Sequence, residues 1–203
     1  MKLYYYPGAC SLSPHIVLRE AGFAFELEKV DLQTKKTETG ADYTRINAKG
    51  YVPTLKLDDG QFLSEGPAIV QYLADQKPEA GLAPKAGTLE RARLQEWLNF
   101  ISTEIHQQYG PLFNPKTPAE TREAQVEKLA RRYDYVAKQL DGKPYLLGER
   151  FGVADAYLYT VTNWAGFLKV DLPSWPALKP YMARIAERPA VQAALQAEGL
   201  AKG

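Results

Sequence analysis

The pattern of apolar and polar positions near the start of the chain predicts short strands that alternate with helices. Residues 2–6 are apolar and aromatic and are followed by a Pro-Gly pair, which predicts a first strand. A helix is predicted over residues 13–21, because a Ser-Pro pair opens this segment and glycine follows it. Residues 25–30 predict a second strand, and residues 42–47 predict a short helix.

Residues 50–67 combine a hairpin with the start of a helix. Two apolar runs, residues 54–57 and 61–63, flank an Asp-Asp-Gly turn, and this arrangement predicts two antiparallel strands. Serine at position 64, with proline close behind, then predicts a helix that continues to residue 76.

Two features of this stretch indicate ligand binding. A proline that opens a strand, here Pro53, is a place for a cis peptide bond, which would turn the backbone N–H and C=O of Val52 outward. A helix N-terminus directly after a strand presents free N–H groups to an anion. Together they suit a peptide-like ligand that carries a carboxylate, although an ordinary hairpin and helix cap account for the same residues.

The predicted fold class is α/β plus all-α. The element order β-α-β-α-β-β-α is that of a thioredoxin-like domain, which we place at residues 1–77. Residues 78–88 are rich in proline and glycine and predict a linker, and residues 89–203 predict an all-helical C-terminal domain. Helices are predicted there over residues 89–109, 118–140, 153–167, 175–187 and 189–198.

The helix predicted at residues 89–109 has two different faces at about 100° per residue. Its apolar stripe, which predicts the core of the bundle, consists of Leu94, Trp97, Leu98, Ile101 and Ile105. Asn99, Thr103 and His106 cluster near the opposite side. This polar face is either a solvated surface or, if it looks across a cleft at the N-terminal domain, part of a site.

Gly152 and Asp155 mark the start of the helix predicted at residue 153. Gly152 is in the N-cap position, and the carboxylate of Asp155 can reach back to the free N–H groups of the first turn. We interpret this pair as stabilising the fold and not as catalytic.

The composition of the chain argues against some classes of binding partner and bears on its cellular compartment. The chain has 203 residues and a formal net charge of +1, so its charge does not indicate binding to nucleic acid or to an anionic membrane surface. A single cysteine excludes an internal disulfide framework and fits a reducing compartment. No apolar run is long enough to span a bilayer, and together with the single cysteine this leads us to expect a cytoplasmic protein. We expect no metal site.

Cys10 lies between the first predicted strand and the first predicted helix. Thioredoxin-like proteins carry a redox cysteine at this place, and here serine stands where a second cysteine would follow. The nearby helix N-terminus is expected to favour the thiolate. A small buried apolar residue is the alternative interpretation.

Taken together, these motifs resemble the glutathione transferases. The resemblance rests on Val52-Pro53, on Ser64-Glu65-Gly66, and on the Gly-Val-Ala-Asp motif that ends at Asp155. The Pro-Gly-Ala-Cys-Ser start and His106 resemble the bacterial beta class in particular. The resemblance covers essentially the full chain. It implies a cytoplasmic homodimer that binds glutathione along the N-terminal domain and uses it in detoxification on hydrophobic electrophiles bound beside the helical domain.

The resemblance also implies roles for individual residues. Val52, before a cis Pro53, is expected to exchange backbone hydrogen bonds with the cysteinyl unit of glutathione. Glu65 is expected to pair with the γ-glutamyl ammonium, the Gly66 N–H to bind the carboxylate of that unit, and Lys35 to meet the glycyl carboxylate. Gly66 stands where many relatives carry serine, so one hydroxyl donor is absent.

The resemblance leaves more than one candidate for the residue that activates the glutathione thiol. Cys10 is expected beside the glutathione sulfur, with His106 as a second catalytic residue, and Asn99 and Thr103 approaching from the helical side. Other classes of the family activate the thiol with a tyrosine or a serine near the first strand. Candidates of that kind also occur here, namely Tyr5, Tyr6 and Ser11.

Three functions remain open on the sequence. Thioether-forming transfer is the first, with glutathione as co-substrate and a hydrophobic electrophile as partner. The second is thiol–disulfide chemistry or glutathione-dependent dehalogenation through Cys10. A non-catalytic binding protein that has kept the fold is the third, and the retained Lys35, Glu65 and Val52-Pro53 argue against it.

Overall fold

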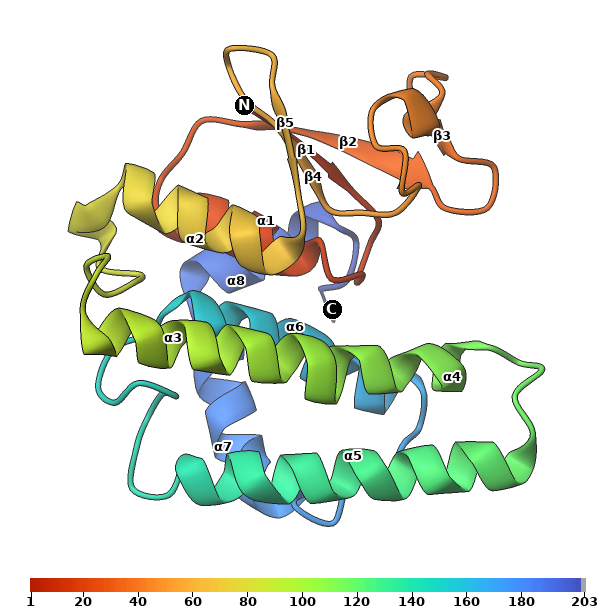
Figure 1. Ribbon diagram of the computed structural model, residues 1–203, viewed down its shortest axis with the longest axis vertical. Helices are drawn as coiled ribbons and strands as arrows, with labels where there is room; N and C mark the ends of the chain where they lie inside the picture. The colour runs from red at the N-terminus through yellow and green to blue at the C-terminus, as the bar shows by residue number, and fades with distance from the viewer. Residues whose placement is uncertain (202–203) are drawn as a thin grey trace. The chain divides into compact units, whose positions relative to one another are not determined.

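A five-stranded mixed sheet forms the centre of the first of two units (Figure 1). The computed structural model describes residues 1–201, and the strand order is β3-β2-β1-β4-β5. The strands are β1 (Lys2–Tyr5), β2 (Glu26–Asp31), β3 (Lys36–Thr37), β4 (Thr54–Lys56) and β5 (Phe62–Ser64). β1 and β2 are parallel, whereas the other neighbouring pairs are antiparallel. The thioredoxin-like prediction is therefore confirmed, and β3 is an added strand of two residues, too short to leave a periodic signal.

Three helices lie on one side of this sheet (Figure 1): α1 (Leu12–Glu20), α2 (Gly66–Gln76) and α8 (Pro189–Ala197). α1 packs against both of the others. Two short 3₁₀ helices complete the unit, η1 (Tyr43–Arg45), which falls inside the helix predicted at 42–47, and η2 (Pro78–Ala80).

α8 belongs to the first unit by its contacts. This unit comprises Met1–Ala83 together with the chain from Glu187, and the second unit comprises Pro84–Ala186. Residues 89–203 were predicted to form one helical domain, whereas the structure groups α8 with the sheet. The reason is that α8 buries Val191 and Ala194 and that Glu198, just after it, is itself buried.

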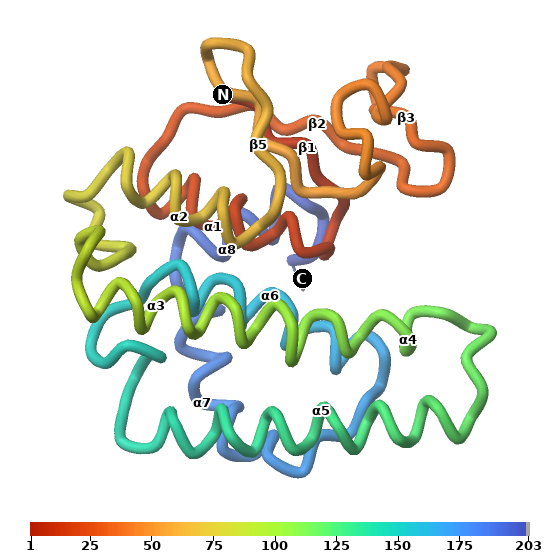
Figure 2. Tube along the Cα trace, viewed as in Figure 1, coloured from red at the N-terminus to blue at the C-terminus, as the bar shows by residue number. Residues whose placement is uncertain are grey.

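The second unit is helical throughout its regular structure. Its main helices are α3 (Leu89–Phe100), α5 (Ala119–Gln139), α6 (Val153–Phe167) and α7 (Trp175–Ala186). α6 is the most buried of them, and α3 and α7 pack against it. In both views α5 runs alongside the chain from α3 to α4 (Gly110–Phe113) (Figures 1 and 2). No helix within residues 1–201 is long and apolar enough to cross a membrane.

The segment predicted as one helix at 89–109 changes its helical period. After α3 the chain makes a π-helical turn, η3 (Ile101–Ile105), and then a 3₁₀ turn, η4 (His106–Tyr109). The apolar stripe is largely confirmed, since Leu94, Leu98, Ile101 and Ile105 are fully buried. A regular period of 3.6 residues fails beyond Phe100, however, so the direction of His106 does not follow from it.

Asp155 stabilises the start of α6, as expected. Its carboxylate accepts hydrogen bonds from the N–H groups of Gly152 and Leu146 and from the hydroxyl of Tyr181, each at 2.9 Å. Burial raises the pKa of Asp155 to about 6, even though these three donors act in the opposite direction.

Candidate functional site

Cys10 lies in the turn between β1 and α1 and is half-buried. Its thiol donates a hydrogen bond to the carbonyl of Val52, with an Sγ–O distance of 3.3 Å. Burial raises the pKa of Cys10 to about 12, and the nearby Glu65 carboxylate adds to the increase. The expectation of a favoured thiolate was therefore wrong: in the folded chain the cost of desolvating the charge exceeds the help from the backbone N–H groups.

The competing hydroxyl groups near β1 differ in what they contact. Ser11 is fully buried, and its hydroxyl bridges the N–H and the C=O of Tyr6, both at 3.2 Å. Tyr5 is buried, with its ring 6.4 Å from the ring of His15. Tyr6 is exposed. The thiol of Cys10, in contrast, forms a hydrogen bond with the backbone of Val52.

Val52 and Pro53 are joined by a cis peptide bond, as the sequence predicted. The carbonyl of Val52 faces Cys10, whereas no protein group within residues 1–201 accepts a hydrogen bond from its N–H. A free backbone donor beside an acceptor is the pattern that pairs with an extended peptide.

Lys35 reaches the same turn from the segment between β2 and β3. Its ammonium donates to the carbonyl of Gly50, with an Nζ–O distance of 2.7 Å. The positive charge of Lys35 thus lies two residues before Val52, at a place where it can meet a carboxylate.

Glu65 and Gly66 form the junction of β5 and α2. Glu65 is the N-cap of α2 and pairs with Lys49, whose ammonium also donates to the hydroxyl of Ser64 at 3.2 Å. The first N–H groups of the helix begin at Gly66 and have no partner inside the helix. A Cβ at Gly66 would lie 3.9 Å from Cγ of Pro53, an ordinary contact that leaves room for the serine of other relatives.

Backbone strain coincides with two of these residues. Among residues 1–201, the non-glycine positions in the left-handed region are Lys35 (φ 56°), Glu65 (φ 73°) and Lys169 (φ 54°). Such conformations cost about 1–3 kcal/mol and concentrate at ligand sites. Two of the three belong to the predicted set, which supports a binding role for this face of the first unit.

The helical-unit candidates have different surroundings. Asn99 and Thr103 are exposed, and the hydroxyl of Thr103 donates to the carbonyl of Asn99 at 3.1 Å. His106 is half-buried in an aromatic cluster, where its Nδ1 lies 2.6 Å from the hydroxyl of Tyr157 and its ring centroid 4.9 Å from that of Trp164. His106, which follows the π-helical turn, thus contacts aromatic rings, whereas Asn99 and Thr103 are exposed.

Sequence reasoning missed several residues that hold this region. The rings of Tyr157 and Trp164 pack against the imidazole of His106. Gln108 is buried and donates to the carbonyl of Thr103 at 2.8 Å, and Gln125 donates to Gln108 at 2.6 Å. The Gln108 side chain thus satisfies a backbone carbonyl of the π-helical turn, and Gln125 holds Gln108 in place. No local sequence motif could have identified either glutamine.

Comparisons with known proteins agree with this arrangement. The family model described as glutathione S-transferase, N-terminal domain, matches residues 8–76, and the model of the C-terminal domain of the same family matches residues 100–189. The chain is similar to the glutathione S-transferase GstA of Escherichia coli O157:H7, with 48% identity over 98% of this chain and 100% of that protein.

Two solved structures are also similar. One is a sphingomonad glutathione S-transferase complexed with glutathione, with a TM-score of 0.94, 48% identity and coverage of 99% of this chain and 100% of that chain. The other is a bacterial beta class glutathione S-transferase from Sphingomonas chungbukensis, with a TM-score of 0.95 and the same identity and coverage.

The fold and the matches define a transferase enzyme built from a thioredoxin-like domain and a helical domain. The chain belongs to the glutathione S-transferase family, and the resemblance stated from the motifs is confirmed.

Proposed function

We propose that this transferase joins the sulfur of glutathione to hydrophobic electrophiles, in detoxification, and that Cys10, Lys35, Val52-Pro53, Glu65 and Gly66 bind the tripeptide. The observation that carries the proposal is at Val52. Within residues 1–201 no protein group accepts a hydrogen bond from its N–H, and its carbonyl takes the thiol of Cys10. The ammonium of Lys35 is bonded two residues earlier, at Gly50, and the Glu65 carboxylate lies near enough to Cys10 to act on its charge. Glutathione offers the complementary groups, an amide backbone with a charge at each end.

The proposed roles follow the chemistry of each group. The cysteinyl unit of glutathione exchanges backbone hydrogen bonds with Val52, which places its sulfur beside Cys10. Glu65 takes the γ-glutamyl ammonium, and the Gly66 N–H at the start of α2 donates to the neighbouring carboxylate. Lys35 takes the glycyl carboxylate.

Donors near the glutathione sulfur lower the pKa of its thiol, because hydrogen bonds to a thiolate favour the charged form. Cys10 is a neutral thiol at pH 7, since burial raises its pKa to about 12, and it therefore serves as a donor. The glutathione thiolate attacks the electrophile, a carbon–sulfur bond forms, and the leaving group departs with the electron pair. Alignment of the two reactants supplies the remaining acceleration.

We assign the electrophile to the helical unit, where aromatic side chains surround His106. Tyr157 and Trp164 contact the imidazole, Phe113 packs against Trp164 with ring centroids 5.3 Å apart, and Phe167 is 78% exposed. Exposed aromatic surface of this kind binds planar apolar molecules. Asn99 and Thr103 are proposed to approach glutathione from the same unit.

Three measurements separate the three candidate functions: retention on a glutathione column, thioether formation and disulfide reduction. Retention on a glutathione column together with thioether formation from an aryl halide supports transfer. Retention without turnover of any aryl halide, but with reduction of a disulfide, favours redox chemistry through Cys10. Retention without either activity indicates a binding protein, and absence of retention contradicts the proposed site.

Replacing Glu65 with glutamine is expected to weaken glutathione binding by about 1.5–3 kcal/mol, or about tenfold to a hundredfold. The amide keeps the shape of the side chain but loses the charge that pairs with the γ-glutamyl ammonium. Isothermal titration calorimetry measures the change. Glu79→Gln, an exposed acidic residue outside the proposed site, serves as the control. Equal affinity of wild type and Glu65→Gln would show that the assigned orientation of glutathione is wrong.

We also propose that the protein is a homodimer. In the second unit Trp97, Phe100 and Tyr135 form an aromatic group with ring centroids 5.1–5.9 Å apart, and Tyr135 is 46% exposed. Aromatic groups at a protein surface are typical of the centres of interfaces.

A charge in that group is expected to oppose association. Tyr135→Lys should raise the dimer dissociation constant at least about tenfold, because an interface centre does not solvate an ammonium. Sedimentation velocity over a range of concentrations measures it. Phe167→Lys places the same charge at another exposed aromatic position and should leave the dissociation constant unchanged. Dimers of unchanged stability in Tyr135→Lys would place the interface elsewhere.

A further inference from the structure

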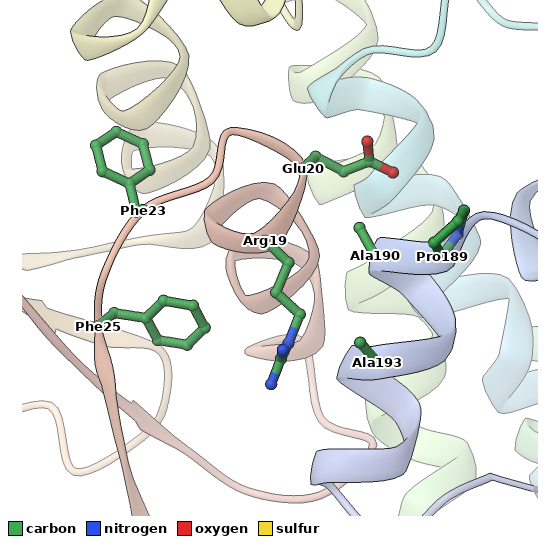
Figure 3. Close-up of a pocket in the computed structure, with 7 residues that line it drawn as sticks. All are labelled: Arg19, Glu20, Phe23, Phe25, Pro189, Ala190 and Ala193. Atoms are coloured by element: carbon green, nitrogen blue, oxygen red, sulfur yellow. The ribbon is translucent and has the colours of Figure 1, made fainter.

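A pocket of about 510 Å³ lies in the first unit, between the C-terminal end of α1 and α8 (Figure 3). Two phenylalanines, Phe23 and Phe25, form one side of it, and Pro189, Ala190 and Ala193 of α8 form the other. The volume is in the range that holds a small organic molecule. None of its lining residues belongs to the proposed glutathione site.

Arg19 extends through this pocket between Phe25 and Ala193 (Figure 3). Its guanidinium carbon lies 5.6 Å from the centroid of the Phe25 ring. Its Nε donates to Nε2 of His15 at 2.9 Å, which leaves the two terminal amino groups for another acceptor. Within residues 1–201, no carboxylate forms an ion pair with Arg19.

The acidic groups near Arg19 are already paired. Glu20, which also lines the pocket, binds Arg188 through both carboxylate oxygens, at 2.6 and 2.9 Å. Because Arg19 donates to Nε2 of His15, the imidazole carries its proton on Nδ1 and donates it to Glu198. The second oxygen of Glu198 accepts the N–H of Gly8 at 2.9 Å. Glu198 therefore does not bond Arg19 directly, because the imidazole of His15 lies between the carboxylate and the guanidinium.

A second cation borders the pocket. The ammonium of Lys77 lies 4.5 Å from the centroid of the Phe23 ring and donates to the carbonyl of Gly22 at 2.9 Å. Each of the two phenylalanine rings therefore has a cation beside it, Arg19 at Phe25 and Lys77 at Phe23.

We propose that this pocket binds an aromatic monocarboxylate, with the carboxylate on the terminal amino groups of Arg19 and the aromatic body between the two phenylalanines and α8. A guanidinium donates two parallel hydrogen bonds to the two oxygens of a carboxylate, a geometry that matches a single planar anion. The small side chains of Ala190 and Ala193 leave space for a flat ring. A phosphate ester is a poorer fit, because it would place a doubly charged group among apolar walls with a single guanidinium to hold it.

The test uses the full chain and 2-naphthoate as the probe, measured by calorimetry while S-benzylglutathione saturates the proposed catalytic site. Wild type is expected to bind one naphthoate per chain and to bind the neutral 2-naphthamide at least tenfold more weakly. Arg19→Met, which keeps the length but removes the donors, is expected to lower naphthoate affinity at least tenfold. Ala193→Leu, which fills the pocket and leaves Arg19 intact, is expected to abolish binding.

Matched controls are Arg45→Met and Ala197→Leu. Arg45 is 87% exposed and outside the pocket, and Ala197 is an exposed alanine at the end of the same α8. Both controls should bind like wild type. The proposal is overturned if wild type does not bind naphthoate, or if both pocket variants bind it with unchanged affinity. The comparison of variants holds whether or not S-benzylglutathione binds, so it is independent of the proposed function.

Discussion

Replacing Asp155 with alanine is expected to lower the free energy of unfolding by about 3–5 kcal/mol. Three donors depend on this carboxylate, the N–H groups of Gly152 and Leu146 and the hydroxyl of Tyr181, and all three bonds are buried. A buried donor that loses its acceptor costs about 1–3 kcal/mol. Water that enters the space left by the side chain can bond some of these donors, so the expected loss of unfolding free energy is smaller than three times the largest cost of one unpaired donor.

The size of this loss is expected to depend on pH. Burial raises the pKa of Asp155 to about 6 in the folded protein, from 3.8 for the free side chain. Between these values the folded state binds a proton that the unfolded chain does not bind, so the contribution of Asp155 to stability increases as the pH falls through 6. The difference between wild type and Asp155→Ala should therefore grow by about 1 kcal/mol from pH 7 to pH 5.

Denaturant unfolding followed by tryptophan fluorescence measures both effects, because Trp97, Trp164 and Trp175 all lie in the second unit with Asp155. The control is Asp171→Ala, an exposed aspartate whose loss should change the free energy by less than about 0.5 kcal/mol. A difference that shrinks as the pH falls would mean that the three hydrogen bonds outweigh burial and that the carboxyl is not shifted upward.

The sequence predicted what is encoded locally. Strands β1, β2, β4 and β5, the start of α2 and the cap at Asp155 each follow from a turn, a cap or a period in adjacent residues. The membership of α8 in the first unit was not predicted, because it depends on contacts of Glu198 with Gly8 and His15 that are far apart in sequence.

The ring contacts of His106 with Tyr157 and Trp164 were not predicted for a related reason. A regular helix was assumed through residue 109, whereas the chain takes a π-helical turn at Ile101–Ile105. That turn is supported by Gln108 and Gln125, and the second of these comes from α5. A change of helical period that depends on a distant helix leaves no signal in the period of the segment itself.

Cys10 shows the same limit in its electrostatics. Its place before α1 was visible in the sequence, and so was the favourable effect of a helix N-terminus on a thiolate. The degree of burial was not visible, and burial decides the sign of the shift by raising the pKa of Cys10 to about 12.

This pKa leads to the sharpest expectation for the redox alternative. Oxidised glutathione should add one glutathione to Cys10 slowly at pH 7, and about tenfold faster for each unit of pH up to pH 9. The Cys10 thiolate attacks one sulfur of the disulfide, a mixed disulfide forms, and the other half leaves as the glutathione thiolate and takes up the proton. Since Cys10 is the only cysteine, no internal disulfide can displace the adduct.

Intact mass and peptide mapping follow the adduct, and a reductant should remove it. Free glutathione serves as the reference. An unperturbed thiol titrates near pH 8.5, so its exchange rate should begin to level off by pH 9, where that of Cys10 still rises. A rate for Cys10 that levels off near pH 7 would contradict the raised pKa, and no adduct at any pH would mean that the thiol is inaccessible.

Cys10→Ala is expected to abolish thiol–disulfide exchange completely while aryl transfer falls only about tenfold, the loss expected for one hydrogen bond to a charged sulfur. The other proposed donors, His106 and Tyr6, are expected to keep part of the stabilisation of the glutathione thiolate. Cys10→Ser separates the two roles, since its hydroxyl keeps the donor without the redox chemistry, and it should retain more aryl transfer than Cys10→Ala and no exchange. Both activities are measured in parallel on variants shown to fold and to bind glutathione. If both variants bind glutathione but lose transfer entirely, Cys10 is indispensable to transfer itself, and its role as one donor among several is wrong.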